Sequence, residues 1–399
     1  MFICRFASIF SYYPKYSANL NQDRNFGARH YIHMMKRETQ KADQVLLLYV
    51  FLLVIFGLVA LTSASAPVGY ERFGDTYYFI KKQIFSGLIP GAALFLFFGH
   101  VNYQLWKKFS SIIYFAAVIM LLLVFIPPIG LTINGARSWI EIGAFTFQPS
   151  ELAKLVTVLV LAKFMADQKR NLEDLPSGVL PIIAILSLPL FMIAAQPDVG
   201  TLSIIAVIII AMLFLGDMPK KFLLAIAALG AIAFAVMMIV APYRVARLNT
   251  FLHPELDPQG VGYQINQAFL AIGSGGFWGV GLGHSRQKFQ YLPEVQADSI
   301  FAVVAEETGF LVSTVMVVLI LLIGFRMLRI AKETHDKFGR LVVSGVAIWF
   351  VWQSFQNIGS MVGILPLTGV PLPFVSHGGS AFMLGLAAVG VVANVSKGN

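Results

Sequence analysis

One aspartate stands where a polar stretch of the chain meets a long apolar one. Asp298 closes the polar stretch 287–298 and precedes the apolar segment 299–325. A carboxylate there could act as a general base, but an ordinary Asp, with a pKa of about 3.9, needs close positioning and desolvation to take a proton from a hydroxyl. The position also suits an N-cap residue, whose side chain accepts the first N–H groups of a helix. The pattern alone allows both interpretations of Asp298.

A second pair of charged residues lies inside another apolar stretch. Glu151 and Lys154 are three residues apart, so a helix places them on one face, and Pro149 suits its first turn. Glu151 is favoured at the positive N-terminal end of a helix, which explains it structurally. Lys154 lies a full turn further in, where a charge is costly unless it is paired or faces a cavity. We therefore expect Lys154 to pair with Glu151 or to bind an incoming phosphate.

Further polar residues on the same side could bind an anionic substrate. Glu306 and Glu307 follow Asp298 by about two helical turns, and they either add charge to the same site or pair with a cation elsewhere. The loops of this side carry the remaining candidates, each of which could equally be a solvated loop residue: Arg137, Trp139, Arg244, Arg247, Arg286, Gln287, Lys288 and Ser376. Their cations together would suit a pyrophosphate, assisted by a divalent metal such as Mg²⁺ or Mn²⁺.

The composition places these residues in a membrane protein. Of 399 residues, 57% are hydrophobic and 12% are charged, with a mean hydropathy of +0.76. Soluble proteins carry roughly 25% charged residues. The net charge of +9 does not indicate a nucleic-acid partner, because the basic residues stand in short runs between apolar segments. The single Cys4 provides neither a disulfide nor a thiolate metal site.

Ten apolar segments are long enough to cross a bilayer, which takes about 17–25 residues each. They predict an all-α polytopic fold with helices near 44–65, 80–99, 109–128, 149–166, 177–195, 199–216, 221–241, 300–325, 340–362 and 378–396. Basic runs such as Lys107-Lys108 and Lys220-Lys221 mark one side, with both termini, as cytoplasmic. Residues 1–43 are expected to form a basic cytoplasmic tail, disordered or lying on the membrane, before the membrane domain 44–399.

The loops on the opposite side are expected at 66–79, 129–148, 196–198, 242–299 and 363–377. The loop 242–299, between helices 7 and 8, far exceeds the usual limit of about 15 residues for an unstructured connection, which indicates a functional loop. Within it a helix with one apolar face is predicted from the spacing of Ile265, Ala268, Phe269 and Ile272. The glycines in 273–283 match no nucleotide-binding fingerprint and predict a tight re-entrant turn.

Five ordered motifs carry a resemblance to a known family: Asn-Gly-Ala-Arg-Ser-Trp at 134–139, the segment 147–154 around Glu151, Gln-Pro-Asp-Val-Gly-Thr at 196–201, the segment 291–301 around Asp298, and the Pro-rich loop that ends at 378–380. Over roughly 44–396 the chain resembles the SEDS membrane proteins of bacterial cell-wall synthesis. The loop 281–288 is similar to that of the FtsW branch, including its sporulation relative, rather than the RodA branch.

The resemblance implies a ten-helix glycosyltransferase of the bacterial cytoplasmic membrane. Such an enzyme polymerises lipid II, a disaccharide-peptide on undecaprenyl pyrophosphate, at the outer face, usually with a class B penicillin-binding protein and other divisome membrane proteins. The family's essential loop carboxylate falls on Asp298, and its buried acid–base pair on Glu151 and Lys154. The chain departs from the family at Gln296-Ala297, where His-Thr is usual, and at His377, where Tyr is usual.

These observations lead to one mechanistic hypothesis and three alternatives. Asp298 would deprotonate the 4-hydroxyl of the acceptor sugar, which attacks the anomeric carbon of the donor with inversion, while cations including Lys154 or a divalent metal stabilise the departing polyprenyl pyrophosphate. The alternatives are a lipid II flippase, a RodA-like role in elongation, and a non-catalytic scaffold that recruits the penicillin-binding protein. A carrier needs its polar residues near the midplane, whereas this chain concentrates them in and around an outer loop.

Overall fold

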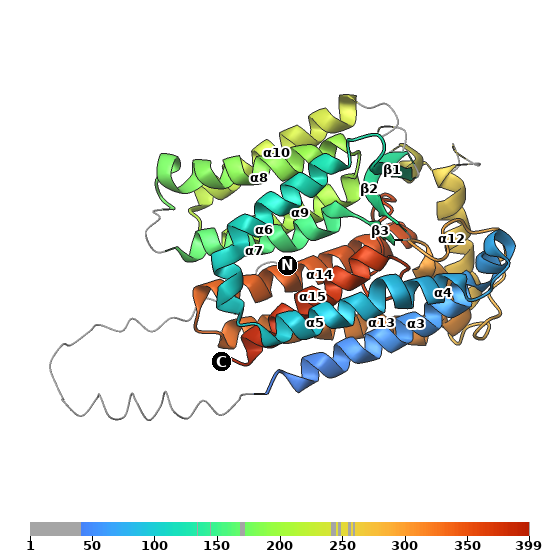
Figure 1. Ribbon diagram of the computed structural model, residues 1–399. Helices are drawn as coiled ribbons and strands as arrows, with labels where there is room; N and C mark the ends of the chain where they lie inside the picture. Colours follow the sequence, from blue (N-terminus) through green and yellow to red (C-terminus); the bar gives the residue numbers. More distant parts are fainter. Residues whose placement is uncertain are drawn as a thin grey trace.

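The computed structural model describes residues 41–133, 135–143, 145–167, 172–240, 245, 249–253, 257 and 260–398. Its helices run side by side in one elongated bundle, and a small sheet and one further helix gather at one end of it (Figure 1). The predicted tail 1–43 lies outside the described residues except for its last three positions. The same holds for Arg244 and Arg247.

The bundle contains a helix for each of the ten predicted segments. In chain order the helices are α3 (Gln44–Phe73), α4 (Tyr78–Gln83) and α5 (Ile89–His100) joined by a π-helical turn, α6 (Tyr103–Leu123), α7 (Pro149–Ala166), α8 (Leu180–Ala195), α9 (Val199–Leu215), α10 (Lys220–Val240), α12 (Val261–Gly275), α13 (Ile300–Glu333), α14 (Lys337–Met361) and α15 (Gly379–Ser396). By length and composition, 8 of the described helical spans could cross a membrane, and α9 is a shorter apolar helix. The prediction of an all-α polytopic membrane fold is confirmed.

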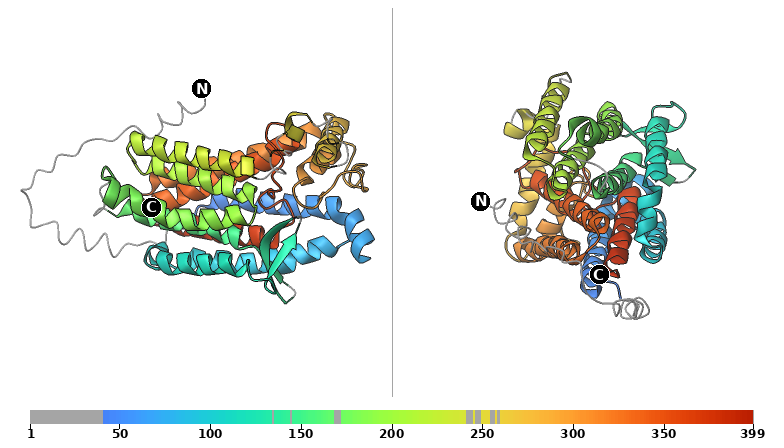
Figure 2. Two further views of the ribbon diagram at one scale, coloured as in Figure 1. Left: turned by 90° about the horizontal axis from the view of Figure 1, so that it is seen from above. Right: turned by 90° about the vertical axis from the view of Figure 1, so that its left-hand side faces the viewer.

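Both ends of the described chain lie at the same end of the bundle, which we call the terminal end. There the backbone N–H of Asp43 donates to Ser396 Oγ at 3.0 Å, and Arg326 Nη2 lies 2.6 Å from Asp43 Oδ2. We call the opposite end, which carries the sheet and α12, the loop end; the left view of Figure 2 shows the two ends separated by the length of the helices. An even number of crossings follows from this arrangement.

Helices α7 and α14 form the interior of the bundle. Nearly every residue of α7 is buried, and α14 packs against α7, α9, α13 and α15. Three charged residues occur in α7, namely Glu151, Lys154 and Lys163, which a helix facing lipid would not tolerate. By contrast, α10 exposes most of its apolar side chains and packs mainly against α9, as expected for a helix that faces lipid.

The predicted loop 129–148 contains a three-stranded antiparallel sheet, which the sequence analysis did not predict. Its strands are β1 (Gly130–Ile133), β2 (Ala136–Ile142) and β3 (Phe145–Phe147), in that order. Ile133 of β1 pairs with Ala136 of β2. The intervening sequence, Asn134-Gly135, is the signal of a tight β-hairpin, whose turn requires a positive φ. Gly135 has such a φ, 79°. The loop predicted at 66–79 is also shorter than expected, because α3 continues to Phe73.

The predicted helix in the long loop is α12, and the glycines after it pack against a break in α13. Gly309 has φ 73° and interrupts the helical backbone of α13. The N–H groups of Val280 and Gly281 donate to the carbonyl oxygens of Glu306 and Glu307, both at 3.0 Å. A Cβ on Gly309 would lie 2.3 Å from the backbone nitrogen of Gly279, so only glycine fits. The glycine segment thus lies against α13 at its break.

Candidate active site

Asp298 lies at the loop end, directly before α13. Its side chain is 7% exposed, and its Oδ1 accepts a hydrogen bond of 3.4 Å from Gln264 Nε2 of α12. The N-cap of α13 is Ser299 and not Asp298, so the cap interpretation is wrong. Burial, together with the nearby charge of Glu294, raises the pKa of Asp298 to about 7. A carboxyl with that pKa is a far stronger base than an ordinary aspartate and is still partly ionised at neutral pH.

The backbone before Asp298 is a compact turn centred on Glu294. The N–H of Ala297 donates to Glu294 O at 2.9 Å, and Gln296 Nε2 donates to Glu294 Oε2 at the same distance. The N–H of His377 in turn donates to Gln296 O at 2.8 Å, which joins the turn to the Pro-rich loop. Gln296, which stands where the family usually has His, therefore holds the side chain of Glu294 rather than that of Asp298.

Two amide residues of α14, which the sequence analysis missed, bind neighbouring carbonyl oxygens of one loop. Asn357 Nδ2 donates to the backbone oxygens of Asp298 at 2.9 Å and Val370 at 2.8 Å. Gln353 Nε2 donates to Pro371 O at 2.8 Å. Both side chains are nearly fully buried. Uncharged amides one helical turn apart in an apolar segment were the available signal, because a buried amide in a membrane needs partners from other elements.

Lys154 and Glu151 form the predicted pair, inside a closed cage. Lys154 Nζ lies 2.7 Å from Glu151 Oε1 and 2.7 Å from Gln353 Oε1, and it stands 5.0 Å from the ring centre of Trp349. The Lys154 side chain is 0% exposed. In this arrangement the ammonium group meets no solvent, so contact with a phosphate requires the cage to open. The predicted contact of Glu151 and Lys154 with substrate stays a prediction.

The second charged cluster is also closed. Lys288 Nζ lies 2.7 Å from Glu307 Oε1, and Ser63 of α3 donates to the same carboxylate. Glu306 accepts from Ser285 Oγ at 2.5 Å and from backbone N–H groups of the loop at 286 and 287. These contacts fasten the loop that leads to Asp298 onto α13 and α3. The structure thus pairs Lys288 with Glu307 in a buried cluster, while the half-buried Gln287 reaches Glu306 through its backbone N–H. Their predicted substrate contacts stay predictions.

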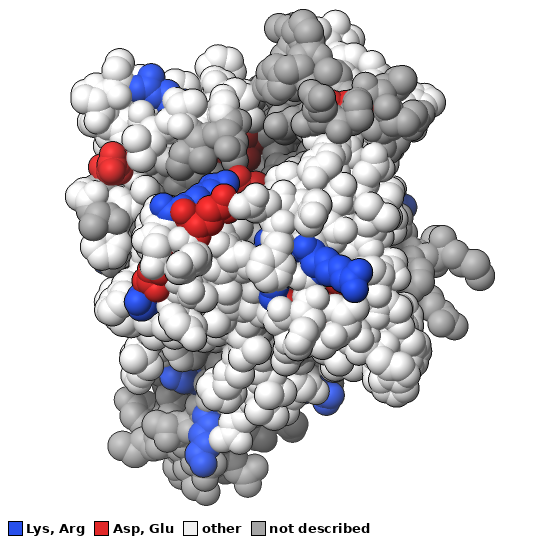
Figure 3. Space-filling model, turned by 90° about the vertical axis from the view of Figure 1, so that its right-hand side faces the viewer, with Lys and Arg blue, Asp and Glu red and all other residues white. Residues whose placement is uncertain are grey.

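The remaining predicted residues lie elsewhere at the loop end. Arg137 and Trp139 belong to β2, where Arg137 Nε donates to Gly130 O at 3.3 Å. Ser376 is buried, and its Oγ accepts from the N–H of Leu372, which stabilises the turn before α15. Figure 3 looks onto the loop end and shows basic and acidic side chains next to one another near the middle of a mostly uncharged face. The substrate contacts predicted for Arg137, Trp139 and Ser376 also stay predictions.

One further acid, Asp198, helps to join the starts of three helices. It caps α9 by accepting from the N–H of Thr201 at 3.0 Å, and it also accepts from Gln148 Nε2 and Ser150 Oγ at the start of α7. The N–H of Gln148 donates to Ser380 Oγ at the start of α15. The order of the motifs 147–154, 196–201 and 378–380 along the chain gave no sign of this meeting, because it is a tertiary contact.

The described residues contain no group of three or more His, Cys, Asp or Glu side chains able to hold a metal ion. The predicted Mg²⁺ or Mn²⁺ therefore has no assigned protein site, and we derive no step through it.

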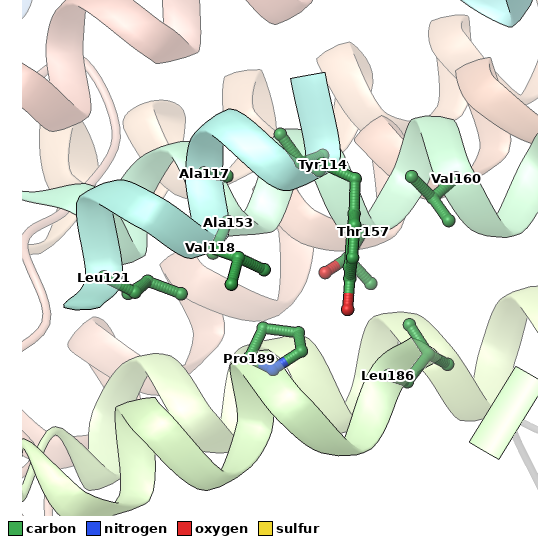
Figure 4. A pocket seen from close by; sticks show the side chains of 10 residues that line it. Tyr114, Ala117, Val118, Leu121, Ala153, Thr157, Val160, Leu186 and Pro189 are labelled. Atoms are coloured by element: carbon green, nitrogen blue, oxygen red, sulfur yellow. The ribbon is translucent and has the colours of Figure 1, made fainter. Parts of the chain in front are cut away.

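A small apolar cavity of about 10 Å³ lies between α6, α7 and α8, away from Asp298 (Figure 4). That volume is at the lower limit of what one water molecule needs, about 10–15 Å³. The hydroxyl of Tyr114 lines it and donates to Ile185 O at 2.6 Å. The ring nitrogen of Pro189, four residues further along α8, carries no hydrogen and cannot donate to that carbonyl. The cavity is a packing feature of a proline-containing helix and not a substrate site.

Comparisons with known proteins agree over nearly the whole chain. The family model described as "Cell cycle protein", which covers FtsW, RodA and SpoVE, matches residues 43–399. Stage V sporulation protein E of Bacillus subtilis is 38% identical over 91% of this chain and 99% of its own length. A probable peptidoglycan glycosyltransferase FtsW of a Geobacter species is 36% identical over 90% of this chain and 98% of its own length.

Two solved structures share the fold. A chain from a peptidoglycan synthase complex that coordinates polymerization and crosslinking has a TM-score of 0.73 at 28% identity, covering 90% of this chain and 98% of its own. The rod shape determining protein RodA of Thermus thermophilus has a TM-score of 0.64 at 27% identity, covering 89% and 96%. The motifs, the bundle and the matched length agree, and the chain belongs to the FtsW/RodA/SpoVE family of SEDS membrane proteins.

Proposed function

We propose that this protein is a peptidoglycan glycosyltransferase that polymerises lipid II at the outer face of the bacterial cytoplasmic membrane. The observation that carries the proposal is the buried Asp298 at the loop end, whose pKa is raised to about 7. Relatives named as probable peptidoglycan glycosyltransferases support the reaction class. The basic runs of the sequence support a cytoplasmic terminal end and therefore an external loop end.

In the proposed reaction Asp298 takes the proton of the acceptor sugar's 4-hydroxyl. The hydroxyl oxygen forms a bond to the anomeric carbon of the lipid-linked donor as the bond from that carbon to the pyrophosphate oxygen breaks. The bonding electrons leave with the polyprenyl pyrophosphate, and the anomeric configuration inverts. Lys154 is the proposed cation for the leaving group, which requires it to exchange Glu151 or Gln353 for a phosphate oxygen.

The distribution of buried charge favours this reaction over a flippase. Among the described residues, the buried charged side chains are Glu151, Lys154, Lys288, Asp298, Glu306 and Glu307. All belong to the loop leading to Asp298 or to the first turns of helices that start at the loop end. A carrier of a charged headgroup needs polar groups along its path through the midplane.

We further propose that the protein builds the septal wall with a class B penicillin-binding protein and other divisome membrane proteins. The match to a chain of a synthase complex that links polymerization to crosslinking supports a partner of this kind. A role in sporulation is the second candidate, because the sporulation protein of Bacillus subtilis is 38% identical to this chain. A RodA-like role in elongation has the weaker support of 27% identity.

The test is reconstitution of the purified protein with labelled lipid II, with and without a class B penicillin-binding protein. We expect glycan ladders from the wild type and none from Asp298→Asn. The matched control is Asp257→Asn, which changes another acid of the same loop, one that accepts from the N–H of Gly260 before α12. Polymer from Asp298→Asn at the wild-type rate would overturn the assignment of the base. Translocation of lipid II without polymer would favour the flippase. The absence of both activities would favour the scaffold.

A further inference from the structure

One hydrogen-bonded chain connects the buried lysine with the backbone of Asp298. It runs from Lys154 Nζ to Gln353 Oε1, from Gln353 Nε2 to Pro371 O, across the peptide link to Val370 O, and through Asn357 Nδ2 to Asp298 O. Its links are 2.7, 2.8, 2.8 and 2.9 Å. We propose that Gln353 and Asn357 are positioning residues, which couple Lys154 to Asp298 through the loop segment 370–371. This proposal rests on the proposed function.

The placement of both amides on α14 makes the connection rigid. Gln353 and Asn357 are four residues apart and therefore lie on the same face of the helix. They are 2% and 1% exposed, so water cannot replace a lost partner, and an unpaired amide there is costly. Gln353 Oε1 also accepts from Trp349 Nε1 at 2.7 Å, which fixes which end of the amide faces Lys154. Each amide thus has one orientation that satisfies its donors.

Asn357 acts on Asp298 through the main chain. Its Oδ1 accepts no hydrogen bond from the described residues, so its contribution lies in its two donors. By holding Asp298 O, these donors keep the residue at the buried position where Gln264 reaches the carboxylate. Without them we expect the turn to move toward solvent. The carboxylate would then be better hydrated, and a better hydrated carboxylate is a weaker base.

Several other ionisable groups surround this turn. Glu294 lies in the turn itself, and its charge acts on Asp298. His377 comes from the Pro-rich loop packed on the turn. From α13, Glu306 and Glu307 are already engaged by the loop and by Lys288. The α14 face toward Asp298 presents amides and hydroxyls, with no ionisable side chain between Trp349 and Met361.

A purely structural role is the alternative, since interhelical amide bonds also hold membrane bundles together. The two roles differ in what they change. Loss of packing alone lowers the amount of active protein and leaves the pH profile of the remaining enzyme in place. Loss of positioning lowers kcat while KM changes little, and it moves the acidic limb of the kcat/KM profile to lower pH, because Asp298 becomes more acidic.

The first test compares Asn357→Leu with Asn394→Leu in the lipid II polymerisation assay. Asn394 is a matched control, because it is a buried amide whose Nδ2 donates to Gly99 O at 2.9 Å at the terminal end. We expect Asn357→Leu to lower kcat about tenfold or more and to shift the acidic limb downward. Asn394→Leu should leave the position of the limb unchanged. An unshifted limb in folded Asn357→Leu would overturn the positioning role.

The second test is a double-mutant cycle with Gln353→Leu. If the two amides act through one chain, the double variant loses little more kcat than the worse single variant, whereas independent effects multiply. Multiplying effects would overturn the coupling. If Asn357→Leu cannot be recovered folded, Gln353→Leu decides alone: Gln353 is hydrogen-bonded to Lys154, Trp349 and Pro371 and not to Asp298, so an unshifted limb in this variant would overturn the coupling. Active wild-type protein in every experiment separates failure of this proposal from failure of the proposed function.

Discussion

The burial of Asp298 predicts an unusual link between stability and pH. Its pKa rises from 3.8 to about 7, a shift of about 3 units. At about 1.36 kcal/mol per unit, burying the ionised carboxylate costs the fold about 4 kcal/mol. Since the folded-state pKa is raised, the stabilising contribution of Asp298 is fully present below the unfolded pKa of about 3.8 and is lost as pH rises through about 7. Asp298→Asn cannot ionise, so its stability should not fall in this way as pH rises.

We therefore expect Asp298→Asn to be inactive and yet more stable than the wild type at pH 8, with the difference shrinking toward pH 4. The Asn side chain keeps an oxygen to accept from Gln264, so little hydrogen bonding is lost. The assay is thermal unfolding of both proteins in detergent across pH 4.5–8.5, scored by a fluorescence or light-scattering transition.

The control is Asp75→Asn, which should show the opposite sign. Asp75 is an exposed carboxyl whose hydrogen bond from Lys81 at 2.8 Å lowers its pKa, so removing its charge brings no gain at high pH. A stability difference between wild type and Asp298→Asn that stays constant with pH would refute the reasoning. It would mean that water or a cation compensates the Asp298 carboxylate in the folded protein.

Two further predictions concern the closed cage and the break in α13. Lys154→Met leaves Glu151 buried without a cation and should lower the free energy of unfolding by about 3–5 kcal/mol. Adding Glu151→Gln should restore much of the thermal stability without restoring polymerisation. Recovered polymerisation in the double variant would show that the pair is structural only. Gly309→Ala should abolish folded, active protein, because Gly309 has φ 73° and a Cβ there would meet the backbone nitrogen of Gly279. The control Gly74→Ala, with φ 67° but open space around it, should lower the free energy of unfolding by about 1–2 kcal/mol and keep activity. Equal losses of expression and activity in the two variants would show that backbone strain alone matters.

The sequence predicted best what depends on local spacing. The spans follow from apolar length, and Lys154 with Glu151 follows from a separation of three residues in one helix. The three-stranded sheet was missed although Asn134-Gly135 signals a hairpin, because the surrounding loop was assigned by exclusion between two apolar segments. Helix α12 was predicted, but only Ile265 and Ala268 of its expected apolar face are buried, while Phe269 is 42% exposed.

The tertiary parts of the site were beyond reach of the sequence for a physical reason. Gln353 and Asn357 bond main-chain oxygens, and a main-chain oxygen carries no residue-type signal. Lys288 looked like an accessible loop cation, and only the fold shows it buried against Glu307. The same holds for Asp198, whose partners Gln148 and Ser150 lie 50 and 48 residues away in the chain.

The desolvation that weakens the fold at Asp298 is also what makes the residue useful. An aspartate free in solution would be ionised at pH 7 but too weak a base, whereas a carboxyl with a pKa of about 7 combines partial ionisation with a strong tendency to take up a proton. Such a group needs a surrounding structure that prevents it from turning toward water. The contacts of Gln264 on its side chain and of Asn357 on its backbone meet that need from two helices. The position of the base therefore depends on two buried amide side chains, Gln264 and Asn357.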